Sequence, residues 1–137
     1  MSDLEDKFLQ SWIKHRLPRS PPLRREYRFS STRRFRFDFC ILSVKLAIEI
    51  DGYAYGQRCG SCKQPKNGYH QTITGINNSA EKQNLAIEEG WTVVRFTTAQ
   101  LSSAEKRKEC VEQVNRILIR MGDERIAIYN TTTPTSD

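Results

Sequence analysis

Two neighbouring segments in the first half of the chain alternate between apolar and other residues with a period of two. The first runs from about residue 33 to 41 and the second from 44 to 51. Successive side chains of a strand point to opposite faces of a sheet, so this pattern predicts two β-strands with one core-facing side each. The apolar positions are Phe35, Phe37, Phe39 and Ile41 in the first strand, and Val44, Leu46, Ile48 and Ile50 in the second.

Spacing and capping signals predict the remaining elements. Apolar residues three and four positions apart indicate helices, and β-branched apolar runs indicate strands. Ser79 is a plausible N-cap and Gly90 a stop for a central helix, while Ser102 or Ser103 begins a last helix that Gly122 ends. The predicted elements are a helix at 3–14, strands at about 25–30, 33–41 and 44–51, a helix at about 80–89, a strand at 91–96 and the last helix.

This order predicts an α/β fold. Three consecutive strands with short links favour an antiparallel meander, and the helix before the fourth strand favours a parallel crossover. A mixed four-stranded sheet flanked by helices is the simplest arrangement. With 137 residues, the chain is expected to form one domain over residues 1–122, with a long loop at 53–78 after the third strand and a flexible tail at 123–137.

The charge distribution suggests a polyanionic partner. The net charge is +6, and arginines crowd between the first helix and the third strand, interleaved with aromatic residues. Such a stripe can neutralise nucleic-acid phosphates, although a solvated face of a half-buried hairpin would look the same. No apolar run is long enough to cross a membrane and no secretory signal is visible, so we expect no membrane partner and a cytoplasmic location. The candidate DNA-binding residues here are Arg24, Arg25, Arg28, Arg33, Arg34 and Arg36.

Three acids occupy unusual places in the predicted strands. Asp38 lies inside the second strand, and Glu49 and Asp51, two residues apart in the third, point to the same side. If the two strands pair, all three carboxylates meet on one face, opposite both apolar stripes. Mid-strand acids are costly unless something compensates them, and Mg²⁺ is a natural compensation because it prefers carboxylate oxygens. Cross-strand ion pairs with Arg34, Arg36 or Lys45 are the alternative explanation.

These residues resemble the PD-(D/E)XK, or restriction-endonuclease-like, nuclease superfamily. Within it, the chain is most similar to small endonucleases related to very-short-patch repair enzymes and to their uncharacterised phage and bacterial relatives. The resemblance spans about residues 3–121. It rests on Phe37-Asp38-Phe39 and Leu46-Ala47-Ile48-Glu49-Ile50-Asp51-Gly52, supported by Glu5, Gly68-Tyr69-His70, Glu81-Lys82-Gln83 and Gly90-Trp91-Thr92-Val93-Val94-Arg95-Phe96.

The resemblance implies an αβββαβ core and a metal-dependent DNA endonuclease using Mg²⁺ or Mn²⁺. Asp38 and Glu49 would bind the metal, with Asp51 as a third carboxylate and Glu5 as an accessory acid from the first helix. Symmetric double-strand cleavage would require a homodimer. The location would be a bacterial cytoplasm, or the host's for a phage protein.

The chain departs from the family pattern at its third signature position. The family usually has Lys where this chain has Asp51. Lys82 on the following helix is the candidate substitute, to orient water or neutralise transition-state charge, unless it is a plain surface lysine. His70 could act as a general acid or base, or be a loop histidine bonded to backbone. The departure also keeps a second hypothesis open, a DNA-binding protein that has the fold without the chemistry.

The long predicted loop carries further candidates. Cys59 and Cys62 form a lone CxxC, whereas a structural zinc normally has four ligands in two pairs, so zinc is not expected there. The loop is instead expected to touch DNA beside the catalytic face, through backbone contacts and a stacking aromatic. The candidate residues are Tyr53, Tyr55, Arg58, Lys63 and Lys66.

Overall fold

The computed structural model describes residues 3–51 and 73–122, and their elements follow the predicted order. Most of the predicted 53–78 loop and the 123–137 tail lie outside these ranges. The elements are α1 (Asp3–His15), β1 (Arg24–Arg28), β2 (Arg36–Ile41), the 3-10 turn η1 (Leu42–Val44), β3 (Leu46–Asp51), α2 (Ile73–Glu88), β4 (Thr92–Thr97), the 3-10 turn η2 (Ala99–Leu101) and α3 (Ala104–Met121).

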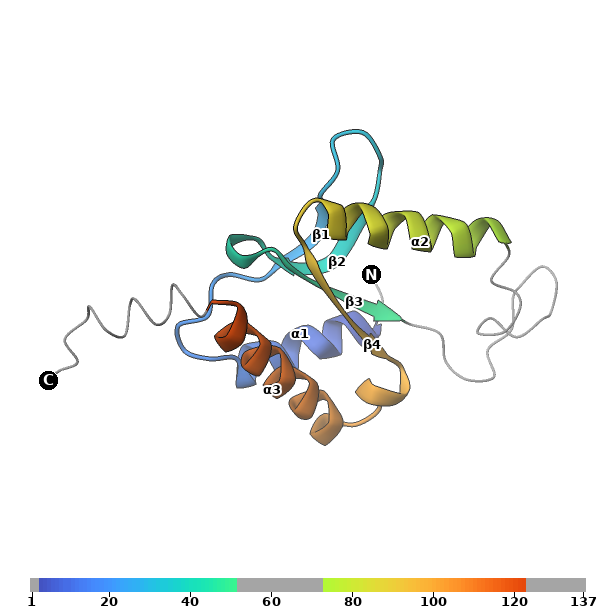
Figure 1. Cartoon of the computed structure of the whole chain (residues 1–137). Coiled ribbons are helices and arrows are strands. Elements are labelled where there is room, and N and C mark those ends of the chain that lie inside the picture. Colours follow the sequence, from blue (N-terminus) through green and yellow to red (C-terminus); the bar gives the residue numbers. More distant parts are fainter. Residues whose placement is uncertain (1–2, 52–72, 123–137) are drawn as a thin grey trace, which may run out of the picture.

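The four strands form one mixed sheet in the order β1-β2-β3-β4. β1–β2 and β2–β3 are antiparallel, whereas β3 and β4 run parallel, with α2 between them in the chain. The predicted meander and crossover are therefore confirmed. α2 covers one face of the sheet, and α1 and α3 lie together on the other (Figure 1).

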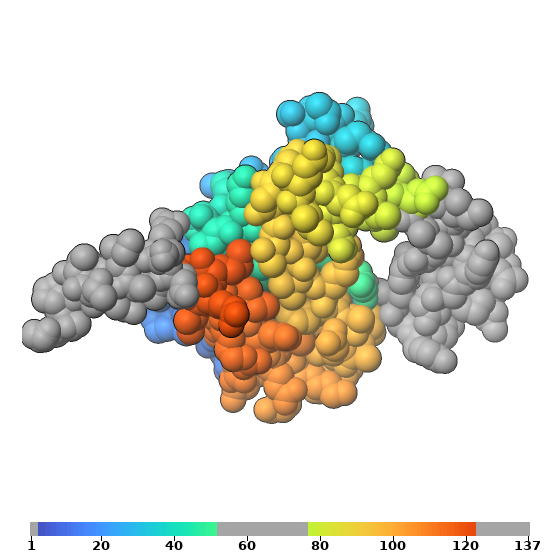
Figure 2. All heavy atoms as spheres, viewed as in Figure 1, coloured from blue at the N-terminus to red at the C-terminus, as the bar shows by residue number. Residues whose placement is uncertain are grey.

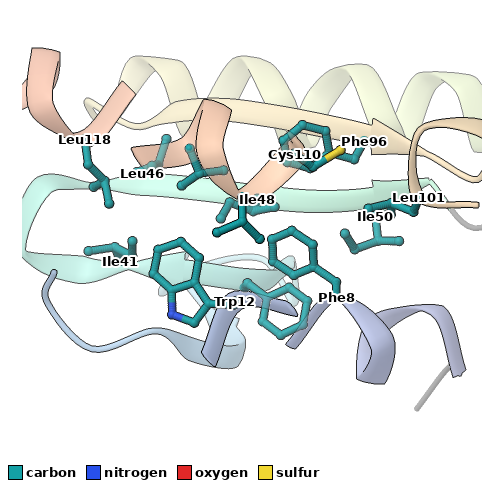
Figure 3. Packing of buried hydrophobic residues seen from close by; sticks show 13 residues of the cluster. Phe8, Trp12, Ile41, Leu46, Ile48, Ile50, Phe96, Leu101, Cys110 and Leu118 are labelled. Carbon is teal, nitrogen blue, oxygen red and sulfur yellow. The ribbon is translucent and has the colours of Figure 1, made fainter. Parts of the chain in front are cut away.

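The sheet is buried on both faces. On the α1–α3 face, Phe8 and Trp12 of α1 point toward β2 and β3 (Figure 3). The core there consists of these two residues with Phe39, Ile41, Leu46, Ile48, Ile50, Phe96, Leu101, Cys110, Val111, Val114 and Leu118. On the α2 face, a second core contains Phe37, Cys40, Ala47, Ala86 and Trp91. Because β3 contributes to both cores, its run of apolar residues is nearly continuous.

The predicted single apolar face of the second strand is wrong. Phe37 packs in the core under α2, whereas Phe39, two residues later, packs in the core under α1 and α3. The neighbouring strand changes face at the same place: Tyr27 joins the α2 side, while Arg25 lies against Phe39. Glu26, between them, has a left-handed φ of 51°. This conformation, which disfavours residues with a Cβ by about 1–2 kcal/mol, occurs between the Arg25↔Phe39 and Tyr27↔Phe37 pairs, where the strands change face.

Most predicted helix ends are confirmed. Gly90 ends the α2 region with a φ of 92°, the Ser103 side chain caps α3 by accepting from the Lys106 amide, and Gly122 caps its C-terminus. The predicted start of the central helix is wrong, because α2 begins at Ile73 and Ser79 lies within it. The expected 53–78 loop is thus shorter at its C-terminal end. None of the helices in the described ranges is long and apolar enough to cross a membrane.

Candidate active site

The site forms where β2 and β3 separate. Paired residues run from Ile41↔Leu46 to Phe39↔Ile48. At the next position the side chains take over the backbone hydrogen bonds: the Asp38 amide donates to Glu49 Oε2 (3.0 Å), and the Ile50 amide donates to Asp38 Oδ2 (2.8 Å). These reciprocal bonds satisfy amides that would otherwise be orphaned in a part-buried region. They also hold the two carboxylates side by side, as the sequence predicted.

Lys82 reaches this pair from α2. Its Nζ lies 2.6 Å from Glu49 Oε1, and the two side chains are only 21% and 10% exposed. Ala86, one helical turn later, is fully buried against the sheet, so it fixes the helix face that presents Lys82. The same Nζ lies 5.9 Å from the centroid of the Phe37 ring. The predicted substitute lysine is therefore in contact with a predicted metal ligand, and it is not a plain surface lysine.

Burial dominates the electrostatics of Asp38. Desolvation raises the pKa of this carboxyl from 3.8 to about 6. The hydrogen bond from Ile50 and the charge of Lys82 lower the pKa, while the charges of Glu49 and Glu5 raise it further. Glu5 lies on α1, and its own pKa is raised mainly by burial and then by Glu26. The accessory acid predicted on the first helix is thus close enough to act on Asp38 electrostatically.

The raised pKa of Asp38 predicts a pH-dependent stability. Between about pH 4 and 6 the folded protein holds this proton more tightly than the unfolded chain, so stability falls as pH rises through that window. Asp38→Asn removes the charge and keeps an acceptor for the Ile50 amide. In EDTA, the free energy of unfolding should be measured with urea. The value for the variant minus the value for the wild type should increase by about 1–2 kcal/mol from pH 4.5 to pH 7.5.

The control for this measurement is Glu88→Gln, which removes a negative charge from an exposed side chain near the end of α2. The two proteins should be compared at both pH values and in the same ionic strength. A difference between Asp38→Asn and the wild type that is flat, or that grows toward low pH, contradicts the assignment.

Asp51 takes part in a different arrangement. Its Oδ1 lies 3.5 Å from Arg95 Nη1, and Arg95 also donates through Nε and Nη2 to Gln83 Oε1 at 3.1 and 2.8 Å. Arg95 is the β4 neighbour of Glu49 in the parallel register. Neither Arg95 nor Gln83 was predicted from the sequence to have a role. The sequence feature that could have identified them is the charge of Arg95 among the apolar residues of β4, because such a charge indicates a compensating partner on an adjacent strand.

The donor atoms at the strand opening suit a hard divalent cation. Asp38 Oδ2 is used by the Ile50 amide, while no hydrogen bond from the described part of the chain reaches Asp38 Oδ1. Within residues 3–51 and 73–122, no three His, Cys, Asp or Glu side chains form a metal-binding group, so the expected convergence of three carboxylates holds only for Asp38 and Glu49. Mg²⁺ is commonly held by one or two carboxylates plus water and phosphate oxygens, and these two residues fit that requirement.

The arginines of the predicted DNA-binding stripe have different roles. Arg25 pairs with Asp6 of α1 at 3.0 Å, and Arg28 donates through Nε to the carbonyls of Ser30 and Arg33. Arg36 lies 3.7 Å from Glu26, and Arg33 lies 3.1 Å from Glu81. Arg24 and Arg34 are exposed and make no ion pair with the described residues. The stripe therefore divides into side chains that support the fold and side chains available to a ligand.

The remaining candidates fall outside the described residues. These are His70, the loop residues Tyr53, Tyr55, Arg58, Lys63 and Lys66, and the Cys59–Cys62 pair. The other two cysteines, Cys40 and Cys110, are free and buried, and burial raises the pKa of both thiols, to about 11 for Cys40. These thiols are poor nucleophiles and add nothing to the site.

No protein-family model, no curated protein and no solved structure matches this chain.

Proposed function

We propose that the protein is a DNA endonuclease of the restriction-endonuclease-like type that hydrolyses phosphodiester bonds with Mg²⁺ or Mn²⁺. The observation that carries the proposal is the contact of Lys82 with Glu49, beside Asp38, at the opening between β2 and β3. Two carboxylates and a lysine, partly buried at one point, are groups that can support phosphodiester hydrolysis with a divalent cation. The exposed arginines nearby supply sites for flanking phosphates.

Each residue has a distinct role in this proposal. Asp38 and Glu49 hold the cation, which when bound polarises a phosphoryl oxygen and lowers the pKa of the attacking water. Lys82, adjacent to the ligand Glu49, places a positive charge where negative charge develops on the phosphate. Glu5 acts through its electrostatic effect on Asp38. Asp51 is neutralised by Arg95, so we assign it to the support of β3 and β4.

The test is a nicking assay on supercoiled plasmid in Mg²⁺, in Mn²⁺ and in EDTA. We expect conversion to open circles or linear DNA with either metal and none in EDTA. A parallel panel of single-stranded, duplex, mismatched and four-way-junction DNA identifies the preferred structure. Absence of cleavage of every substrate in both metals contradicts the proposal.

A second candidate is a DNA-binding protein without catalysis. The observation that favours it is that Glu49 and Asp51 already have cationic partners, Lys82 and Arg95. Compensation of the strand acids by ion pairs needs no metal. Metal binding separates the candidates: a nuclease should bind Mn²⁺ in a manner abolished by Asp38→Asn, whereas the binder should retain DNA in EDTA and show no Mn²⁺ affinity at this site.

A further inference from the structure

The loop between β1 and β2, residues 29–35, forms a projecting hairpin tip with a fixed shape. Ser30 is buried, and its Oγ accepts from the amides of Thr32 (3.1 Å) and Arg33 (2.9 Å). Arg28 Nε closes the base of the tip on the carbonyls of Ser30 and Arg33. The tip stands out beyond α2 in the space-filling view, where it is cyan (Figure 2). These hydrogen bonds therefore preorganise the backbone of the hairpin tip in the absence of a ligand.

Aromatic rings connect the hairpin tip to the candidate active site. Phe29 stacks on Phe37 with the ring centroids 4.1 Å apart and an angle of 6° between the ring planes. It also stacks on Phe35, with a centroid distance of 6.3 Å and an angle of 17°. The Phe37 ring in turn lies under Lys82 Nζ. The stack thus runs without interruption from the lysine to the tip. A group held by the tip is placed beside the strand opening on the α2 side of the sheet.

Arg33, at the hairpin tip, forms an exposed ion pair that a ligand can replace. Its guanidinium lies over the Phe35 ring at 4.5 Å and pairs with Glu81 at 3.1 Å, and the two paired side chains are about half exposed. Glu81 directly precedes Lys82 in α2. An ion pair this exposed contributes little stability, because water solvates both charges well. A phosphate group offers the same guanidinium a stronger site, since its binding also releases counterions from DNA.

We propose that the hairpin tip binds the backbone of duplex DNA beside the scissile phosphate, and that Arg33 exchanges Glu81 for a phosphate when DNA binds. This inference rests on the nuclease function proposed above. Arg34, exposed at the same tip, contributes a second phosphate contact. Glu81 is then an internal competitor that weakens DNA binding until a correctly placed phosphate displaces it. Arg25 and Arg28, which are used within the fold, make no direct contribution to DNA affinity.

The test is fluorescence anisotropy with a labelled DNA duplex in EDTA, where no cleavage occurs. Arg33→Ala should weaken binding about tenfold near 100 mM salt and reduce the slope of log K against log salt by about 0.9. Glu81→Gln should tighten binding about threefold, because Arg33 no longer has to leave a carboxylate. In the Arg33→Ala background, Glu81→Gln should have less than half of that effect.

Glu88→Gln, a loss of the same charge elsewhere on α2, is the control for general repulsion of DNA. Arg116→Ala, at an exposed arginine of α3 on the other face of the sheet, is the control for general loss of positive charge. Far-UV circular dichroism checks that each variant is folded. The exchange is overturned if Glu88→Gln tightens binding as much as Glu81→Gln, or if Glu81→Gln acts equally with and without Arg33. The assignment to duplex DNA is overturned if only RNA or single strands show the dependence on Arg33.

Failure of this inference differs from failure of the nuclease proposal. If the wild type cleaves DNA, Asp38→Asn does not, and Arg33→Ala binds like the wild type, the nuclease stands and the role of the tip is wrong. If no DNA is cleaved but the Arg33 and Glu81 variants shift affinity as described, the tip is confirmed as a DNA-binding element and the nuclease proposal falls.

Discussion

Asp38→Asn is expected to lower plasmid cleavage by about a thousandfold or more, since in the proposed nuclease it loses a metal ligand and several kcal/mol of transition-state stabilisation. Asp38→Asn disturbs the hydrogen bonds of the site less than Glu49→Gln does. Among the hydrogen bonds to described residues, Asp38 uses Oδ2 alone, for the Ile50 amide, and the Asn oxygen can replace it. Glu49 uses both oxygens, for the Asp38 amide and for Lys82, so Glu49→Gln would also break a bond that holds the site.

The controls separate lost chemistry from lost structure. Asp3→Asn makes the same chemical change at the exposed start of α1, where Asp3 pairs with Lys7, and it should cleave at the wild-type rate. Isothermal titration with Mn²⁺ should show binding by the wild type and by Asp3→Asn but not by Asp38→Asn. Binding of duplex DNA in EDTA should be unchanged or tighter. Cleavage by Asp38→Asn within tenfold of the wild-type rate would remove the assigned role.

The element order was predictable from the periodicity of apolar residues and from the capping residues. Alternation identified β2 and β3, and the pairing of these strands brought Asp38 beside Glu49 as expected. The change of face at Asp38 was not predictable. Phe37 and Phe39 have the spacing of a regular strand, yet they pack in different cores where the neighbouring strand has the left-handed Glu26. Such a conformation is uncommon for Glu, so nothing in the local sequence indicated it.

Parts of the site that depend on the crossover were harder to predict. Gly75, Asn77 and Asn78 have low helix propensity, which favoured a helix start after them, yet α2 begins at Ile73. The partners of Arg95 depend on the parallel register of β3 and β4, and no periodicity in either strand specifies that register. The contact between Lys82 and Glu49 was predicted only as a substitution for a missing family lysine. Its geometry depends on how Ala86 seats α2 against the sheet.

Lys82→Met is expected to reduce kcat by about a hundredfold to a thousandfold with little change in KM. In the proposed mechanism, the charge that it removes acts on the developing phosphate charge and not on DNA binding. Methionine keeps the length and the apolar part of the side chain over Phe37. Lys82→Arg, which keeps the charge, should recover part of the rate. Lys7→Met, at an exposed lysine of α1, is the matched control and should cleave normally.

A structural role of Lys82 is distinguished by stability measurements. The Glu49 side chain is only 10% exposed, so Lys82→Met leaves a buried carboxylate without its cation and should destabilise the protein in EDTA by about 3 kcal/mol. Adding Glu49→Gln to that variant should restore most of the stability and none of the cleavage. Cleavage by Lys82→Met at the wild-type rate, in a folded protein, would show that Lys82 serves only to neutralise Glu49 and takes no part in hydrolysis.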